Sequence, residues 1–218
     1  MTPSTPQSPA SRPRASSTGD VERDPVPVQG VRTLLDDAGI SRSLLRIAHE
    51  IVERTAEPER LYLVAIPNGG IPLARRLARG LREVADLTVP VGILDTTLYR
   101  DDLLTTGNRP ALRRTEMPSA VDDHIVVLVD DVVKTGRTIR AAMDALMDFG
   151  RPAAVQVVGL VDRGHRELPI KLDYVGKNVP TAAREQVQLR NVDGDENTLE
   201  LVIIGAPDDE DRGEESES

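Results

Sequence analysis

The sequence predicts an α/β fold with a doubly wound, mainly parallel sheet and a small β-rich hood. Strand-like and helix-like segments alternate between positions 42 and 161, which is typical of a parallel sheet. Val126–Val129 is an unbroken aliphatic run, the pattern of a strand buried on both faces. Beyond position 170 the apolar runs are short and strand-like, and these predict the hood.

The first elements expected are a helix, a strand and a second helix. Arg42–Thr55 has one apolar side and is predicted to be a helix capped by Ser41. Leu61–Ile66 is predicted to be a strand, and the turn Pro67–Gly70 leads into a helix from about Pro72 to Val84. The apolar side of the first helix comprises Leu44, Leu45, Ala48, Ile51 and Val52.

The middle of the chain continues the alternation. Strands are expected at Val89–Leu94, Ile125–Asp130 and Ala154–Val161. Residues 99–124 are polar and form a long loop, and a loop of that length inside a compact domain is usually functional, so we predict an active-site lid. A helix is predicted after the third strand, from the apolar residues Ile139, Met143, Leu146 and Met147.

The two ends of the chain differ from its middle in composition. Residues 1–28 are rich in Ser, Thr, Pro and Arg, and residues 206–218 carry seven acidic side chains against Arg212. Both are predicted to be disordered tails, which leaves a folded domain at 29–205. The hood strands expected at the end of that domain are Leu172–Val175, Val187–Val192 and Leu199–Ile204.

Composition excludes several classes of protein. The chain has 218 residues, a net charge of −9 and no cysteine, which rules out disulfides, thiol nucleophiles and cysteine-bound zinc. No apolar run approaches the ~20 residues of a membrane span, and no secretory signal is visible, so we expect a cytoplasmic protein that does not enter the membrane. Aromatic residues make up 2%, too few for base-stacking platforms, so nucleic-acid binding would need a local basic patch.

The most informative motif lies at 126–138. Asp130 and Asp131 stand where a buried strand ends, and open α/β sheets bind ligands at that edge. The loop Thr135–Thr138 then opens a helix, whose N-terminal N–H groups can bind phosphate. Two carboxylates beside such a cradle can accept hydrogen bonds from sugar hydroxyls and help to hold Mg²⁺. The motif therefore predicts a sugar-phosphate site.

Other readings of this motif are weaker. An acidic pair at a strand end also occurs in phospho-receiver domains, and the loop matches neither the P-loop nor the dinucleotide fingerprint. The whole stretch, however, resembles the phosphoribosyl pyrophosphate (PRPP) signature of type I phosphoribosyltransferases. Strand before and helix after the loop is the context that this signature requires.

The resemblance extends over residues 29–204 and is to the PyrR family. Members of that family regulate pyrimidine operons by transcription attenuation through RNA and are also uracil phosphoribosyltransferases. The most family-specific piece is Val161–Pro169, which reads Val-Asp-Arg-Gly-His-Arg-Glu-Leu-Pro. The other similar segments are Arg46–Glu50, Leu73–Ala78, Thr97–Leu103, Arg140–Leu146 and Val175–Pro180.

The resemblance implies the reaction of uracil with PRPP to give UMP and diphosphate, with Mg²⁺ as cofactor. Asp130 and Asp131 would bind the ribose hydroxyls and organise the metal, and a lid from Arg100 would exclude water, so these three are the catalytic residues implied. Asn68, Gly69 and Gly70 would bind diphosphate, and Val161, Asp162 and Arg163 would face the base. The PRPP-binding residues implied are Val126, Val127, Leu128, Val129, Asp130, Asp131, Val132, Val133, Lys134, Thr135, Gly136, Arg137 and Thr138.

Two departures from the family pattern bear on catalysis. The diphosphate turn usually ends in Thr-Arg-Gly, but here it reads Asn68-Gly69-Gly70, so a positive charge near the leaving group is missing. Position 134 is commonly aromatic and here is Lys134, which is either a solvated loop residue or a replacement for the lost charge. These changes concern catalytic efficiency more than ligand binding.

The resemblance also implies RNA binding, to the leader mRNA of a pyrimidine operon, with UMP or UTP as effectors and a homo-oligomer of two or more copies. Arg42, Arg46 and His49 would form a basic stripe on the first helix. The alternative is an ordinary solvated helix face, because Glu53 shares it and Leu45 stands where the family often has Thr. The other RNA-binding candidates are Arg163, Arg166, Lys171 and Lys177.

Two alternatives stay open. The chain could be an RNA-binding regulator that senses nucleotides and turns over poorly, or a phosphoribosyltransferase for another base such as hypoxanthine. The altered turn at Asn68–Gly70 is the feature that separates the first alternative from an active enzyme, whereas the Asp162–His165 segment speaks against the second.

Overall fold

The centre of the fold is a five-stranded parallel sheet. The computed structural model describes residues 30–67, 69–99, 114–182, 185–192 and 195–205. The strands of the central sheet are β2 (Leu61–Ala65), β3 (Val91–Ile93), β4 (Ile125–Val133), β5 (Ala154–Asp162) and β6 (Tyr174–Asn178). They lie in the order β3-β2-β4-β5-β6, and every pair is parallel. The predicted doubly wound α/β fold is confirmed.

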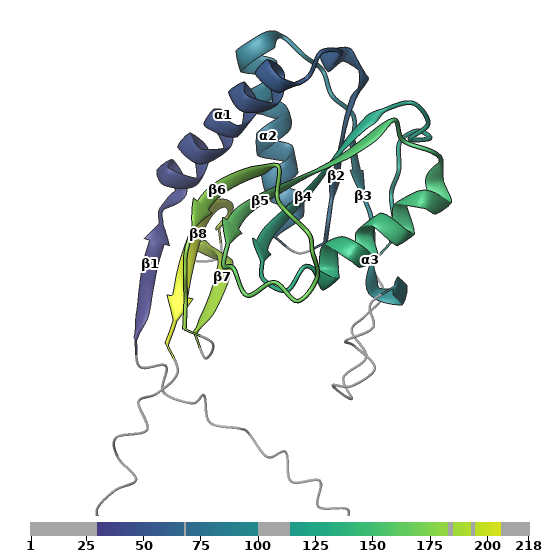
Figure 1. Cartoon of the computed structure of the whole chain (residues 1–218). Coiled ribbons are helices and arrows are strands. Elements are labelled where there is room, and N and C mark those ends of the chain that lie inside the picture. The colour runs from purple at the N-terminus through teal and green to yellow at the C-terminus, as the bar shows by residue number, and fades with distance from the viewer. Residues whose placement is uncertain (1–29, 68, 100–113, 183–184, 193–194, 206–218) are drawn as a thin grey trace, which may run out of the picture.

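Helices cover both faces of this sheet, as a fully parallel sheet requires. They are α1 (Asp37–Arg54), α2 (Gly70–Ala85) and α3 (Arg137–Leu146), with short 3₁₀ turns η1 (Pro58–Arg60), η2 (Thr97–Tyr99) and η3 (Met147–Phe149). Figure 1 shows α1 and α2 on one face and α3 on the other. The core divides accordingly, with Leu63 and Val127 packing among α1 and α2 residues, and Val64 and Leu128 among α3 residues.

A second, antiparallel sheet completes the fold. Its strands are β1 (Val31–Leu35), β7 (Gln186–Val192) and β8 (Asp195–Ile204), in the order β1-β8-β7. The predicted strands at 187–192 and 199–204 are confirmed, but β1 was not foreseen. The assignment of Leu172–Val175 to the hood is wrong. Tyr174 instead pairs with Val158 of β5, and β6 forms an edge of the central sheet, where Leu172 and Tyr174 are buried.

The first helix begins one turn earlier than its apolar pattern indicated. Its N-cap is Asp36, whose carboxylate accepts a hydrogen bond of 2.7 Å from the Gly39 N–H, so the prediction of Ser41 as cap is wrong. Asp37 then accepts bonds from the Leu199 N–H and from Arg76. Burial alone would raise the pKa of Asp37, but these two partners outweigh it and lower that pKa below its ordinary value. The first turn is thus fixed by β8 and α2.

The long loop expected at 99–124 is described only in part. Arg100 and the rest of 100–113 lie outside the described residues, as do the two predicted tails up to residue 29 and from residue 206. From 114 onward the chain returns to the sheet edge, where Glu116 pairs with Ile93 in an antiparallel bridge. Within the described part of the chain, no helix is long and apolar enough to cross a membrane.

Candidate active site

The acidic pair sits where β4 leaves the core. Asp130 is 5% exposed and Asp131 is half-buried, and the strand continues beyond them to Val133. One carboxylate oxygen of Asp130 accepts the Asp131 N–H at 3.0 Å, and one of Asp131 accepts the Val132 N–H at 2.9 Å. These local bonds fix both side chains at the carboxyl edge, where ligands of open α/β sheets bind.

The loop after β4 is built to receive an anion. Gly136 has φ of +90°, a conformation that favours glycine, and α3 begins directly after it. The N-cap residue is Gly136, which has no capping side chain, and the Arg137 N–H makes a long bond of 3.3 Å to Thr135 Oγ1. N–H groups at such a helix start can bind a ligand. A hollow of about 240 Å³ opens there, lined by Asp130, Val132, Val133, Lys134, Thr135, Gly136, Thr138 and Ile139.

The turn before α2 meets the acidic pair. A Cβ atom placed on Gly69 would lie 2.2 Å from Oδ2 of Asp131, and one on Gly70 would lie 2.4 Å from the carbonyl oxygen of Val129. Both positions therefore need glycine in this arrangement, because no Cβ fits at such distances. Asn68, the first residue of the predicted diphosphate turn, lies outside the described residues. The structure thus brings Gly69 and Gly70 to the end of β4, beside Asp131.

The predicted base-binding residues follow the neighbouring strand, because β5 ends beside β4 with Val133 opposite Asp162. Asp162 accepts the Gly164 N–H and pairs with Arg166, both at 2.9 Å. Arg163 is 7% exposed and donates to Thr181 Oγ1 at 2.9 Å and to the Glu185 carbonyl at 2.6 Å. Its guanidinium is therefore occupied within the chain.

The predicted RNA-binding residues fall into two groups. Arg42 and His49 are exposed on α1, as are Lys171 and Lys177 elsewhere, whereas Arg163 and Arg166 are bonded inside the fold. Arg46 is exposed as well, but it pairs with Glu50 and also donates to the carbonyls of Val175 and Gly176 on β6. The stripe on α1 thus adjoins β6, which carries Lys177.

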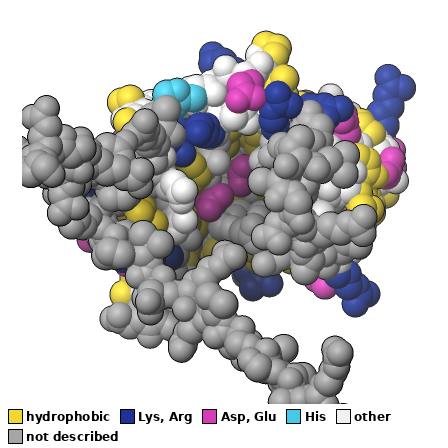
Figure 2. Space-filling view, turned by 90° about the horizontal axis from the view of Figure 1, so that it is seen from below, with side chains coloured by type: hydrophobic (Ala, Val, Ile, Leu, Met, Phe, Trp, Pro, Cys, Tyr) yellow, Lys and Arg dark blue, Asp and Glu magenta, His cyan; other side chains and the backbone are white. Residues whose placement is uncertain are grey.

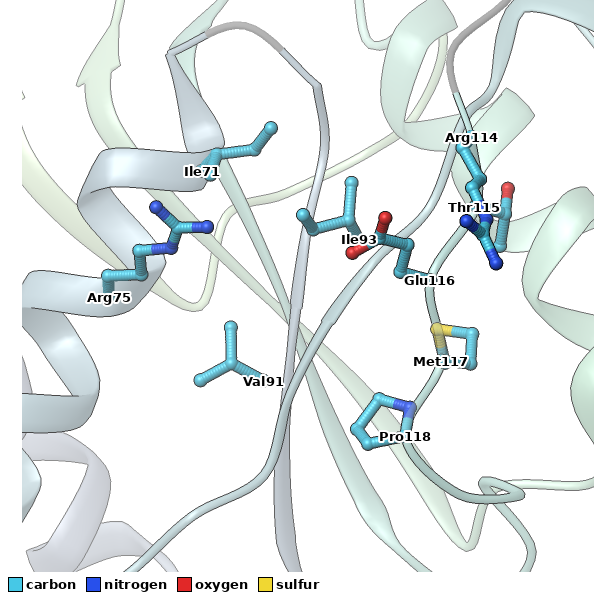
Figure 3. Close-up of a pocket in the computed structure, with 9 residues that line it drawn as sticks. All are labelled: Ile71, Arg75, Val91, Ile93, Arg114, Thr115, Glu116, Met117 and Pro118. Carbon is cyan, nitrogen blue, oxygen red and sulfur yellow. The ribbon is translucent and has the colours of Figure 1, made fainter.

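A larger hollow of about 640 Å³ lies at the β3 edge of the sheet (Figure 3). Ile71 and Arg75 of α2 line one side and the segment 114–118 the other, with Val91 and Ile93 between them. Its described lining has a single carboxylate, Glu116, and no acidic pair at a strand end. Size alone would favour it, but its chemistry does not suit a sugar phosphate, so the smaller hollow is the candidate active site.

The view onto the carboxyl edge supports that choice. Figure 2 shows acidic side chains inside a depression of this face, with Lys and Arg side chains near its described margin.

The backbone contacts made by Glu167 and Leu168, whose N–H groups both donate to the Thr135 carbonyl, were not foreseen. No side-chain pattern in the sequence signals such main-chain bonds, because any residue except proline can make them.

The sheet order, the acidic pair and the anion loop define the class of protein. Residues 30–191 match the sequence profile of the Phosphoribosyl transferase domain. Among solved structures, the fold resembles the hypoxanthine phosphoribosyl transferase of Trypanosoma cruzi, with a TM-score of 0.61 and 21% identity over 81% of this chain and 91% of that one. A hypoxanthine-guanine phosphoribosyltransferase of Bacillus anthracis gives a TM-score of 0.55 and 21% identity over 68% and 84%. The chain is a phosphoribosyltransferase of the type I fold.

Closer relatives define the family. The chain is 58% identical to the "Bifunctional protein PyrR" of Pelotomaculum thermopropionicum over 77% of its length and 94% of that protein. Proteins of the same name from Streptomyces coelicolor and Deinococcus radiodurans are 55% and 53% identical, over 82% and 81% of this chain and 91% and 96% of theirs. The chain belongs to the PyrR family.

Proposed function

We propose that this protein transfers the ribose 5-phosphate group of PRPP to N1 of uracil and regulates pyrimidine genes by binding their leader mRNA. The observation that carries the enzymatic half is the convergence of Asp131, Gly69 and the loop at Gly136 on the carboxyl edge of the sheet. Membership of a family whose proteins are named bifunctional supports both halves together.

The reaction asks for positioning and charge neutralisation more than for a nucleophile. The bond between C1 of the ribose and the diphosphate oxygen breaks, a bond from uracil N1 to C1 forms, and uracil loses its N1 proton. The ribose gains oxocarbenium character while negative charge grows on the diphosphate. Asp130 and Asp131 would hold the ribose hydroxyls, and the N–H groups of the loop would hold the 5-phosphate.

The residues at the site fit a Mg²⁺ ion that arrives with its substrate. Among the described residues, no cluster of three or more acidic or histidine side chains could hold a metal alone. Mg²⁺, however, binds through one or two carboxylates together with phosphate oxygens and water. Asp130 and Asp131 supply such carboxylates, and the bound ion would neutralise charge on the diphosphate.

Lys134 offers a positive charge in place of the one missing at position 69. It is half-buried and lines the 240 Å³ hollow together with Asp130 and Thr138. Its ammonium group has no partner among the described residues. A lysine serves phosphate as a point charge. We assign the Lys134 ammonium to the substrate phosphates. Its charge would support turnover although Gly69 stands where the family usually has Arg.

The regulatory half rests on exposed basic side chains. Arg42 and His49 are exposed on α1, and Lys177 on β6 is exposed with one long contact, 3.5 Å from its Nζ to the Leu34 carbonyl oxygen. These side chains make up the proposed basic patch. Such a patch suits the shape and phosphates of a folded RNA. If UMP or UTP at the active site promotes RNA binding, RNA must raise nucleotide affinity by the same factor. An mRNA partner implies a cytoplasmic protein.

The test of the enzymatic half is a comparison of bases. The full-length chain is incubated with PRPP, Mg²⁺ and radiolabelled uracil, orotate or hypoxanthine, and the specificity constants are compared. We expect uracil to be favoured by a wide margin. Preference for hypoxanthine would identify a phosphoribosyltransferase for another base. Absence of turnover combined with tight UMP binding would identify a nucleotide sensor that has lost catalysis.

A further inference from the structure

The anion loop, residues 133–136, has three successive carbonyl groups that accept hydrogen bonds from the segment 163–168, here called the strap. The Arg163 N–H donates to Val133 O at 3.0 Å. The Arg166 guanidinium donates to Lys134 O at 2.7 Å. The N–H groups of Glu167 and Leu168 both donate to Thr135 O, at 3.1 and 3.2 Å. No carbonyl between positions 133 and 135 is left to turn toward the hollow.

This arrangement dictates where the loop's donors point. In a planar trans peptide unit the C=O of one residue and the N–H of the next are directed to opposite sides, and no cis peptide occurs in the described chain. Fixing the carbonyls of 133, 134 and 135 on the strap therefore directs the N–H groups of Lys134, Thr135 and Gly136 away from it. Consecutive N–H groups on one side of a loop form an anion-binding concavity.

Arg166 is the one side chain of the strap that bonds to these loop carbonyls. Its guanidinium also reaches Val133 O at 3.3 Å, Ile170 O at 3.0 Å and the Asp162 carboxylate at 2.9 Å. The chain reverses just before it, through left-handed residues Gly164 and His165 with φ of +71° and +56°. The side chain is 21% exposed, so most of it lies inside this junction.

We infer that Arg166 is a positioning residue for the phosphate site, which holds the anion loop with its N–H groups turned toward the 5-phosphate of PRPP. The inference rests on the proposed function for the identity of the substrate. It differs from the RNA-binding role expected for Arg166, because the donors of the guanidinium are used within the chain. Preorganised donors lower the entropy lost when a ligand binds, so their loss should weaken ground-state binding of PRPP.

The test compares Arg166→Gln with Arg140→Gln, a matched change of an exposed arginine on α3 that pairs with Asp144 at 3.0 Å. We expect Arg166→Gln to raise the KM for PRPP roughly tenfold, which corresponds to about 1.4 kcal/mol, with kcat within about threefold of wild type. Amide hydrogen exchange at Arg163, Glu167 and Leu168, which donate to the loop, should become faster. Arg140→Gln should change neither quantity.

The two readouts separate the inference from the function it rests on. If wild type shows no uracil turnover, the proposed function fails, and hydrogen exchange still decides the role of Arg166. Unchanged exchange and unchanged KM in Arg166→Gln would overturn the inference, as would an equal loss of kcat and kcat/KM. Should Arg166→Gln not fold, Arg166→Lys is used, since a lysine keeps the pairing with Asp162 but cannot reach all the carbonyls. It should then show the same changes with smaller size.

Discussion

Two adjacent glycines at the start of α2 allow one substitution to be tested in two different surroundings. Gly69→Ala places a methyl group against the Asp131 carboxylate, 2.2 Å from Oδ2. Gly70→Ala places the same methyl group 2.4 Å from the backbone carbonyl oxygen of Val129. The methyl group at position 69 would also lie 2.5 Å from Cβ of Asp131, which rotation of the carboxylate cannot move. The Val129 carbonyl belongs to a central strand and already accepts the Ile66 N–H at 3.0 Å.

The expected magnitudes follow from these contacts. An ordinary van der Waals contact is 3.4–4 Å, so at Gly70 either the helix or the strand must shift by about 1 Å. Overpacking of this kind costs about 2 kcal/mol, or a fall in Tm of about 5 °C in a domain of this size. Gly69 has φ of −67° and ψ of −26°, which alanine adopts without backbone strain, but its methyl group meets Cβ of Asp131 at 2.5 Å, so Gly69→Ala should also cost about 2 kcal/mol.

Activity should distinguish the two variants where stability does not. Turning Asp131 aside removes a ligand contact, and a misplacement of about 1 Å can reduce rate by roughly a hundredfold. We therefore expect Gly69→Ala to lose most of its kcat/KM, and to lose more of it than Gly70→Ala, although both variants melt below wild type. Urea unfolding and PRPP turnover measured on both variants test this. A fully active Gly69→Ala, or a Gly70→Ala as stable as wild type, would refute the packing argument.

Three further outcomes are expected. Asp37→Asn should destabilise the domain by about 1 kcal/mol at neutral pH, a modest value because the carboxylate is 40% exposed. The folded pKa of Asp37 lies below its ordinary value of 3.8, so the stabilisation that it provides is present above about pH 4 and is lost as the pH falls through the folded pKa. The difference in unfolding free energy between Asp37→Asn and wild type, measured in urea, should therefore disappear in acid. Gly136→Ala should weaken PRPP binding in calorimetry, because alanine is strained at φ of +90°, and unchanged affinity would contradict the loop assignment. Arg46→Ala and His49→Ala should weaken leader RNA binding at constant salt, with a smaller salt slope for Arg46→Ala and nearly unchanged uracil turnover, whereas wild-type RNA affinity in both would reduce the stripe to a solvated helix face.

The central part of the fold could be predicted because its residues carry strong local patterns. Val126–Val129 is apolar without interruption because both faces of β4 are covered, and all four residues are fully buried. The acidic pair and the loop could be placed at the carboxyl edge for the same reason, since the strand before them and the helix after them were both clear. The mainly parallel sheet then followed from the alternation of elements.

The parts that were missed depend on contacts between distant segments. Tyr174 belongs to the central sheet because it pairs with Val158. The hydrophobic periodicity of the sequence does not indicate which strand a segment pairs with. Asp37 is bound by β8, so the first turn of α1 is fixed by tertiary contacts as well as by its own cap. The closeness of Gly69 to Asp131 likewise depends on how α2 meets β4.

The most direct test of the account is the formation of UMP by wild type and by Asp131→Asn. Asparagine has nearly the same shape and can keep the bond from the Val132 N–H, so only the charge at the strand end is removed. The full-length wild type, with PRPP, Mg²⁺ and labelled uracil, should release UMP and diphosphate in equal amounts. Asp131→Asn should be slower by roughly a hundredfold or more with an unchanged Tm. Equal rates in the two proteins would show that the ribose 5-phosphate group is not transferred at this site.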